Sequence, residues 1–169
     1  MVVWRLFDSI DKQITGWIAR NGIMLLRVAL GIVFFWFGLL KFFPGMSEAE
    51  SLAGRTIGII SFGYVPPSIS LPILAAWECA IGLGFIFGMF LRLTLVLLLF
   101  QMMGAFLPIV LFPAETWKYF PYAPSLEGQY IFKNLVLLGA AVVVGSTVRG
   151  GRIKPDPSKE RTDEGKTDV

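Results

Sequence analysis

Five polar side chains lie within or beside long apolar stretches of the sequence, and they are the residues best suited to chemistry. They are Lys41, Glu78, Gln101, Lys133 and Asn134. A carboxylate inside a membrane-spanning helix costs about 2.5–3.5 kcal/mol or more unless it is paired or protonated. In a helix that begins at Ser70, Glu78 lies about 12 Å from the helix end. In a helix that begins at Leu126, Lys133 lies about 10 Å from its end. We therefore expect these residues to form one polar layer, supplied by four separate spans.

Two interpretations of this layer remain open. In the first, polar contacts hold the helices in register, at about 0.6 kcal/mol each on average. In the second, the layer binds the polar head of a ligand or exchanges a proton, with Glu78 as the acceptor and Lys133 as its counter-charge. Under the second interpretation, Glu78 and Lys133 are the candidate catalytic residues. All five side chains are then candidate ligand-binding residues.

The sequence also excludes several kinds of chemistry. It contains no histidine and a single cysteine, Cys79, so the usual haem ligand, an internal disulfide and a CxxC redox motif are all missing. It has no phosphate-binding glycine loop followed by lysine and no nucleic-acid motif. We therefore expect no metal site and no cofactor bound by a motif.

The composition is that of an integral membrane protein. Of the 169 residues, 55% are hydrophobic and 16% are charged, and the mean hydropathy is +0.68. A soluble domain carries about 25% charged residues. The apolar run 69–112 is too long for one span, so we expect a turn at Gly88–Arg92. The predicted fold is an all-α transmembrane four-helix bundle over residues 23–148, with spans at about 23–43, 70–90, 93–112 and 126–148.

The two ends of the chain differ from this bundle. Residues 1–22 carry apolar residues at spacings of three and four, which predicts an interfacial amphipathic helix that ends at Asn21-Gly22. Residues 149–169 are highly charged without apolar periodicity, which predicts a disordered tail. Basic residues are concentrated in the N-terminal segment up to Arg27, in the C-terminal segment and in the Gly88–Arg92 turn, eleven against four elsewhere. This distribution predicts that both termini are cytoplasmic.

Both predicted outer loops have structure of their own. The first has a short amphipathic helix in which Ser47 and Glu50 have capping-box spacing. Its apolar stripe consists of Ala49, Leu52, Ala53, Thr56, Ile57 and Ile60. We interpret this helix as packing on the membrane surface, with a lid or a partner-docking element as the alternative. The second loop, 113–130, is rich in aromatic residues, which favours headgroup anchoring, with an aromatic mouth over a ligand pocket as the alternative.

Small residues and a proline predict how the spans pack. Ala76, Ala80, Gly84 and Gly88 recur every four residues in the second span and should let another helix approach closely. Pro108 should kink the third span, because it leaves the carbonyl of Gly104 without its helical hydrogen bond.

The layout resembles the DoxX family of four-span bacterial membrane proteins. The resemblance covers about residues 23–150 and is carried by three segments, RVALGIVFFWFGLLK from Arg27, WECAIGLGFIFGMFLR from Trp77, and EGQYIFKNLVLLGAAVVVG in the last span. The family pattern places an arginine and a lysine on the first helix and a glutamate on the second, which correspond here to Arg27, Lys41 and Glu78. It also implies the bacterial inner membrane. Some family members are subunits of thiosulfate:quinone oxidoreductase or partners of thiol-stress and superoxide-detoxifying enzymes.

The resemblance and the polar layer together favour a quinone- or redox-linked membrane subunit. The alternative is a non-catalytic scaffold or assembly factor, and a third hypothesis is a small-molecule or lipid carrier. The expected partners are the lipid bilayer and a redox enzyme, with homo-oligomerisation open and nucleic acid excluded.

Overall fold

The protein is an all-α bundle with four helices that are long and apolar enough to cross a membrane. The computed structural model describes the backbone of residues 2–151, and the side chains from Ile10 onward except that of residue 12. Its main helices are α1 (Val2–Leu40), α3 (Pro67–Phe87), α4 (Leu91–Phe106), α5 (Pro108–Leu111), α7 (Leu126–Phe132) and α8 (Asn134–Ser146). The candidate spans are Gln13–Leu40, Pro67–Phe87, Leu91–Leu111 and Leu126–Ser146. The predicted four-helix membrane fold is confirmed.

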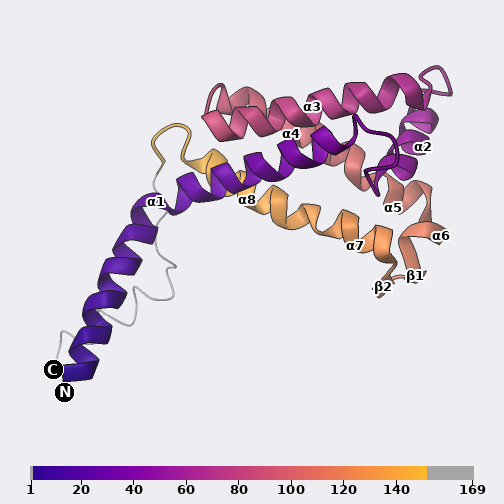
Figure 1. Ribbon diagram of the computed structural model, residues 1–169. Coiled ribbons are helices and arrows are strands. Elements are labelled where there is room, and N and C mark those ends of the chain that lie inside the picture. Colours follow the sequence, from indigo (N-terminus) through magenta and orange to yellow (C-terminus); the bar gives the residue numbers. More distant parts are fainter. Residues whose placement is uncertain (1, 152–169) are drawn as a thin grey trace.

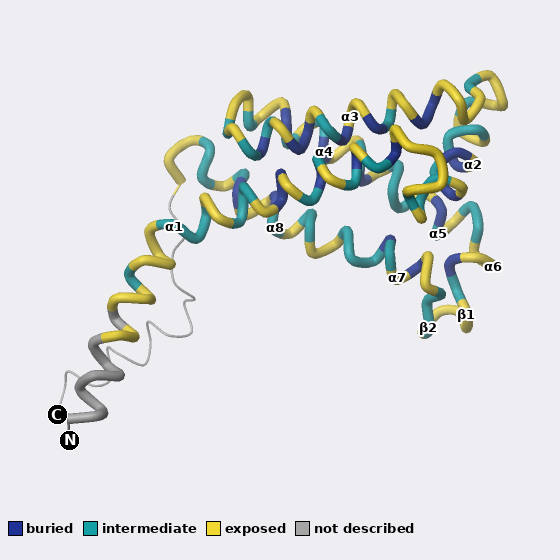
Figure 2. Tube along the Cα trace, viewed as in Figure 1, coloured by how far each residue is buried: buried dark blue, intermediate teal, exposed yellow. Residues whose placement is uncertain are grey.

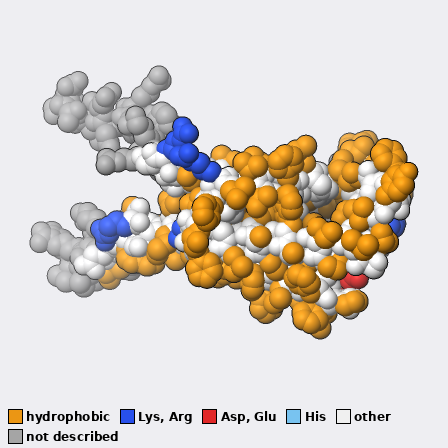
Figure 3. Space-filling view, turned by 90° about the horizontal axis from the view of Figure 1, so that it is seen from above, with side chains coloured by type: hydrophobic (Ala, Val, Ile, Leu, Met, Phe, Trp, Pro, Cys, Tyr) orange, Lys and Arg blue, Asp and Glu red, His pale blue; other side chains and the backbone are white. Residues whose placement is uncertain are grey.

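The burial pattern is that of a bundle surrounded by lipid. Phe85, Ile81 and Leu98 are fully buried at its centre. Large apolar side chains also cover the outside of the bundle, among them Trp36, Phe100 and Val136, each at least 60% exposed. Figure 2 shows the buried positions on the inner faces of the helices, and Figure 3 shows hydrophobic side chains over the outer surface. Such an apolar exterior suits a hydrocarbon environment.

Glycines bring α1 and α3 into close contact (Figure 1). A Cβ atom added at Gly31 would lie 2.7 Å from the carbonyl oxygen of Gly82, and one added at Gly82 would clash with the backbone of Phe35. The predicted small-residue ridge on the second span contributes a separate close approach, to α4. Within that ridge Gly84 contacts Thr94 of α4, and both alanines are exposed.

Three interruptions shape the other spans. The turn between α3 and α4 is Gly88–Phe90, with Gly88 at φ 70°. Helix α5 begins at Pro108, and Leu107 alone separates it from the end of α4. Because proline has no N–H to donate to the carbonyl of Gly104, that carbonyl accepts the backbone N–H of Leu107 instead, at 3.3 Å. The last span is broken at Lys133, between α7 and α8.

The connections between the spans have secondary structure of their own at the end of the bundle that lies away from the N-terminal half of α1. They comprise α2 (Glu50–Ile60), α6 (Pro113–Thr116) and a small antiparallel hairpin of β1 (Trp117–Tyr119) and β2 (Ala123–Pro124), in which Trp117 pairs with Pro124. Ser125 caps α7 as expected, because its Oγ accepts the backbone N–H of Gly128 at 3.0 Å. Figure 1 shows α2 and the hairpin grouped at this end.

Two local predictions are wrong. Asn21-Gly22 does not end a helix, since α1 continues from Val2 to Leu40 and carries the N-terminal segment away from the bundle (Figure 1). Ser47 does not cap α2 either, because the helix begins at Glu50 without a side-chain cap. The Glu50 carboxylate instead accepts the backbone N–H of Gly45 at 2.7 Å. The predicted tail at 149–169 lies almost wholly outside the described residues.

Candidate functional site

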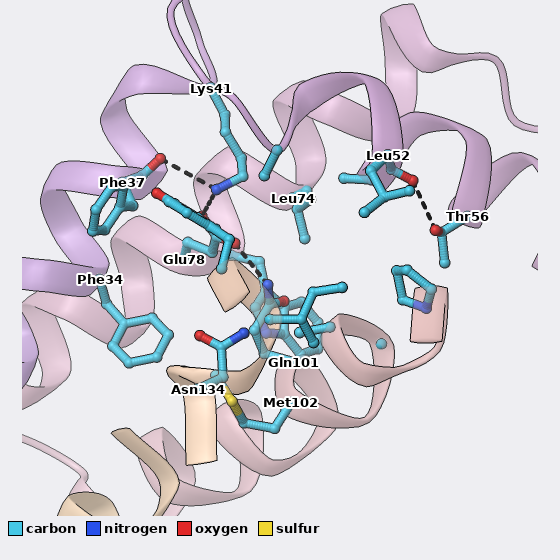
Figure 4. Close-up of a pocket in the computed structure, with 18 of the residues that line it drawn as sticks. Phe34, Phe37, Lys41, Leu52, Thr56, Leu74, Glu78, Gln101, Met102 and Asn134 are labelled. Atoms are coloured by element: carbon cyan, nitrogen blue, oxygen red, sulfur yellow. Dashed lines mark hydrogen bonds and ion pairs between the residues drawn. The ribbon is translucent and has the colours of Figure 1, made fainter. Parts of the chain in front are cut away.

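A cavity of about 640 Å³ lies inside the bundle, in the half that carries α2. Its walls come from α1, α2, α3, α4 and the α7–α8 span, with Pro108 at one edge. The lining is mostly apolar, and its charged side chains are Lys41, Glu78 and Lys133. Figure 4 shows these walls, with Phe34, Leu74 and Met102 among the apolar side chains. A cavity of this size and character is typical of a small-molecule site.

Glu78 is the centre of a hydrogen-bonded cluster in the cavity wall. Its Oε2 lies 2.5 Å from Lys41 Nζ, and its Oε1 accepts Gln101 Nε2 at 2.7 Å (Figure 4). Lys41 Nζ also donates to the carbonyl of Phe37 at 3.3 Å. Glu78 and Lys41 are both buried, with 7% and 9% of their surface exposed. Three spans thus meet at one carboxylate.

The backbone of α1 explains why this ion pair can form. Gly38 lies one turn before Lys41, and a Cβ atom there would be 2.9 Å from Glu78 Cβ. The missing side chain lets the α1 backbone lie against α3 at that level. Lys41 follows the last residue of α1, so its side chain can fold back over the helix end toward the carboxylate.

The expected counter-charge was wrong. Lys41, not Lys133, pairs with Glu78, and Lys41 is buried in the bundle. Lys133 Nζ instead lies 3.1 Å from the ring centre of Tyr130 and 4.5 Å from that of Phe37. All five predicted polar residues nevertheless line the same cavity, Asn134 and Gln101 included.

Helix α2 forms one wall of the cavity. All six residues of its predicted apolar stripe line it, so the interpretation of this stripe as membrane-surface packing was wrong. Thr56 is buried there, and its hydroxyl donates to the carbonyl of Leu52 at 2.7 Å. The spacing of three and four residues correctly predicted an amphipathic helix with one apolar face. It could not show whether that face packs on the membrane or on the rest of the protein.

An exposed ion pair ties α2 to α6. Arg55 donates from both terminal nitrogens to the two carboxylate oxygens of Glu115, at 2.7 and 2.5 Å, and lies over the ring of Phe112. The hydrogen bond from Arg55 holds the pKa of Glu115 below its ordinary value, and the same contact raises the pKa of Arg55. This pair links α2 to α6 at the surface of the protein.

Of the aromatic residues of 113–130, only Tyr130 is part of the cavity lining. Tyr130 lines the cavity and packs edge-on against Phe37, with ring centres 6.0 Å apart. Trp117 packs against Phe120 and Phe132, away from the cavity lining. The aromatic-mouth alternative therefore applies to Tyr130 alone.

Sequence reasoning missed Ser70. It lines a smaller cavity of about 180 Å³ that shares Ile57, Leu74, Trp77 and Gln101 with the larger one. Its buried hydroxyl has no hydrogen-bond partner within the described part of the chain. A serine near a helix start is too common to have indicated this.

The cluster can bind a polar group by hydrogen bonds. Lys41 and Gln101 present N–H donors, and Glu78 presents carboxylate oxygens. Among the described side chains, no group of histidine, cysteine or acidic residues could hold a metal ion. Cys79 follows Glu78, but its thiol faces the carbonyl of Phe35 at 3.8 Å.

Fold and cavity together define an integral, multi-pass membrane protein with an ion pair buried among its spans. A family model described as DoxX matches residues 22–112, which include Lys41, Glu78 and Gln101. The chain belongs to the DoxX family. Neither the curated proteins nor the solved structures include a match to it.

Proposed function

We propose that the protein is a quinone- or redox-linked membrane subunit whose cavity receives the head of a lipid-soluble quinone. The observation that carries this proposal is the position of Glu78. Its carboxylate, held by Lys41 and Gln101, lies in the wall of an otherwise apolar cavity among the spans.

The residues present fit such a ligand. A quinone head carries carbonyl oxygens that accept hydrogen bonds, and its reduced form carries hydroxyl groups that donate them. Lys41 has three N–H donors, and its two hydrogen bonds in the structure, to Glu78 and Phe37, leave one for a ligand. Gln101 has a second N–H in addition to the one that Glu78 accepts. The apolar walls suit the ring and the tail.

The cavity also argues against a purely structural role for the cluster. Interhelical polar contacts can hold helices in register with serine or threonine, at a lower cost than a buried carboxylate. Such contacts need no open volume beside them. A cluster that faces about 640 Å³ of open space is better explained by a ligand that fills it.

A redox role requires a partner. The sequence has no histidine and only one cysteine, so it offers neither the usual haem ligand nor a cysteine set for an iron–sulfur cluster. The electrons would come from a partner enzyme, with this protein supplying the quinone site. The eleven-to-four distribution of basic residues supports an orientation with both termini cytoplasmic, and membership of the DoxX family supports a position in the bacterial inner membrane.

The test is the ligand that co-purifies in mild detergent. We expect mass spectrometry to find a stoichiometric quinone in the wild type and in the control Glu127→Gln, which changes an exposed acid on α7. Glu78→Gln keeps a side-chain oxygen that can accept Lys41 Nζ but removes the charge, so we expect it to fold with reduced stability and to lose the quinone. Folded wild type without quinone, or Glu78→Gln with undiminished quinone, would contradict the proposal. Loss of folded Glu78→Gln protein would favour the role in helix register.

A further inference from the structure

Lys133 is the charged group of the cavity that the Glu78 cluster does not use. It lies at the break between α7 and α8, and it lines the cavity together with its neighbour Asn134. Its ammonium group faces the rings of Tyr130 and Phe37. No carboxylate among the described side chains lies within 4.0 Å of it.

The charges of the lining do not balance. Lys41 and Glu78 neutralise each other, which leaves the positive charge of Lys133. The other described acids do not correct this, because none of them belongs to the lining, and Glu115 is paired with Arg55. A cation among membrane spans is costly without a counter-charge.

The surrounding groups satisfy Lys133 only in part. Aromatic rings attract an ammonium group, but they do not replace hydrogen-bond acceptors for its three N–H groups. Asn134 adds an amide to the same wall, and Figure 4 shows it beside Gln101 and Met102. Lysine and amide donors facing one apolar cavity form a site for an anionic oxygen.

We propose that Lys133 and Asn134 bind an ionised acidic oxygen on the head of the ligand, so that the cavity selects anionic amphipathic molecules over neutral ones. This inference rests on the proposed function, since it takes the cavity as a site for a lipid-soluble ligand. It adds the chemical class of the head. Two sources share that chemistry, an acidic hydroxyquinone and a fatty acid.

Matched pairs of probes test the inference directly. The first pair is 2-hydroxy-1,4-naphthoquinone, which is ionised at neutral pH, and its neutral 2-methoxy analogue. The second pair is oleic acid and oleyl alcohol. Affinities are measured by titration calorimetry in a non-ionic detergent, on wild type, Lys133→Gln and the control Lys118→Gln, which changes an exposed lysine of β1. Asn134→Asp, which places a carboxylate beside the intact lysine, is the second variant.

We expect the acidic member of at least one pair to bind wild type about tenfold or more tightly than its neutral partner, as for a charge-assisted hydrogen bond. Lys118→Gln should keep this preference, and Lys133→Gln and Asn134→Asp should lose it. If Lys133→Gln does not fold, the inference is tested by the preference of the wild type for the acidic probes and by the loss of that preference in Asn134→Asp.

The remaining outcomes separate the two proposals. Equal binding of acid and neutral partner, or a preference that survives in folded Lys133→Gln, overturns the inference and leaves the quinone proposal standing. A Lys133-dependent preference for oleic acid with no binding of either naphthoquinone supports the acidic head and overturns the quinone. Failure of all four probes to bind overturns both.

Discussion

Gly38 of α1 lies directly against the turn of α3 that carries Glu78. A Cβ atom at Gly38 would come within 2.9 Å of Glu78 Cβ and 2.8 Å of the Cys79 backbone nitrogen. Both distances are shorter than ordinary van der Waals contacts. The closeness of the two backbones therefore sets the position of the carboxylate as well as the packing of the bundle.

We expect Gly38→Ala to lower the free energy of unfolding by about 1–3 kcal/mol, because the new methyl group overpacks this contact. Unfolding in mixed detergent micelles measures the change. The control is Gly139→Ala on α8, where an added Cβ meets nothing within 4 Å. Equal tolerance of the two substitutions would contradict the close contact.

The Lys41–Glu78 pair should show strong energetic coupling. Removing one member of a buried ion pair costs about 3–5 kcal/mol, because the other charge is left unpaired. We expect Lys41→Met and Glu78→Leu each to destabilise the protein, and the double variant to be less destabilised than the sum. The same cycle with Lys133→Met in place of Lys41→Met should give a smaller coupling energy. A larger coupling energy between Lys133 and Glu78 than between Lys41 and Glu78 would indicate that Lys133 is the counter-charge.

The Arg55–Glu115 contact predicts a pH dependence. The pKa of Glu115 is lower in the folded protein than in the unfolded chain. Its stabilising contribution is therefore complete above the ordinary carboxyl pKa and is lost as the pH falls through the lowered folded value. The difference in melting temperature between wild type and Glu115→Gln should be constant near neutral pH and shrink in acid. Arg55→Gln, which removes the same contact, should follow Glu115→Gln, and a difference that grows in acid would contradict the assignment.

Ser125 should stabilise the start of α7. Its hydroxyl accepts the N–H of Gly128 and donates to the carbonyl of Glu115 at 2.5 Å. Ser125→Ala should cost about 1 kcal/mol in unfolding free energy, whereas Ser125→Thr keeps both hydrogen bonds and should cost less. Equal losses in chemical unfolding would argue against the cap.

Filling the cavity should displace the ligand without touching the ion pair. Ala53 of α2 lines the cavity, so Ala53→Phe should reduce the amount of co-purifying ligand severalfold. Ala76→Phe adds the same ring at an exposed position on α3 and is the control. Comparable ligand content in the two purified variants would indicate that the ligand binds elsewhere.

Hydropathy and helical periodicity were enough to predict the four-span fold, because each lipid-exposed span requires about 20 consecutive, mostly apolar residues. They also identified five of the polar residues that line the cavity. Choosing the partner of Glu78 required the interhelical contact at Gly38, which depends on backbone proximity between segments about 40 residues apart. The spacing within α2 revealed an apolar face, but only the structure shows that this face covers a cavity.

Because of the glycine contact between α1 and α3, the walls of the cavity differ in how easily their helices can move. The side that holds Glu78 is a helix pair in backbone contact, which cannot separate without opening a void. Another wall contains Lys133, at an interruption between two shorter helices. We therefore expect the shape of the bound head to be dictated at Glu78, and differences in ligand size to be absorbed where α7 meets α8.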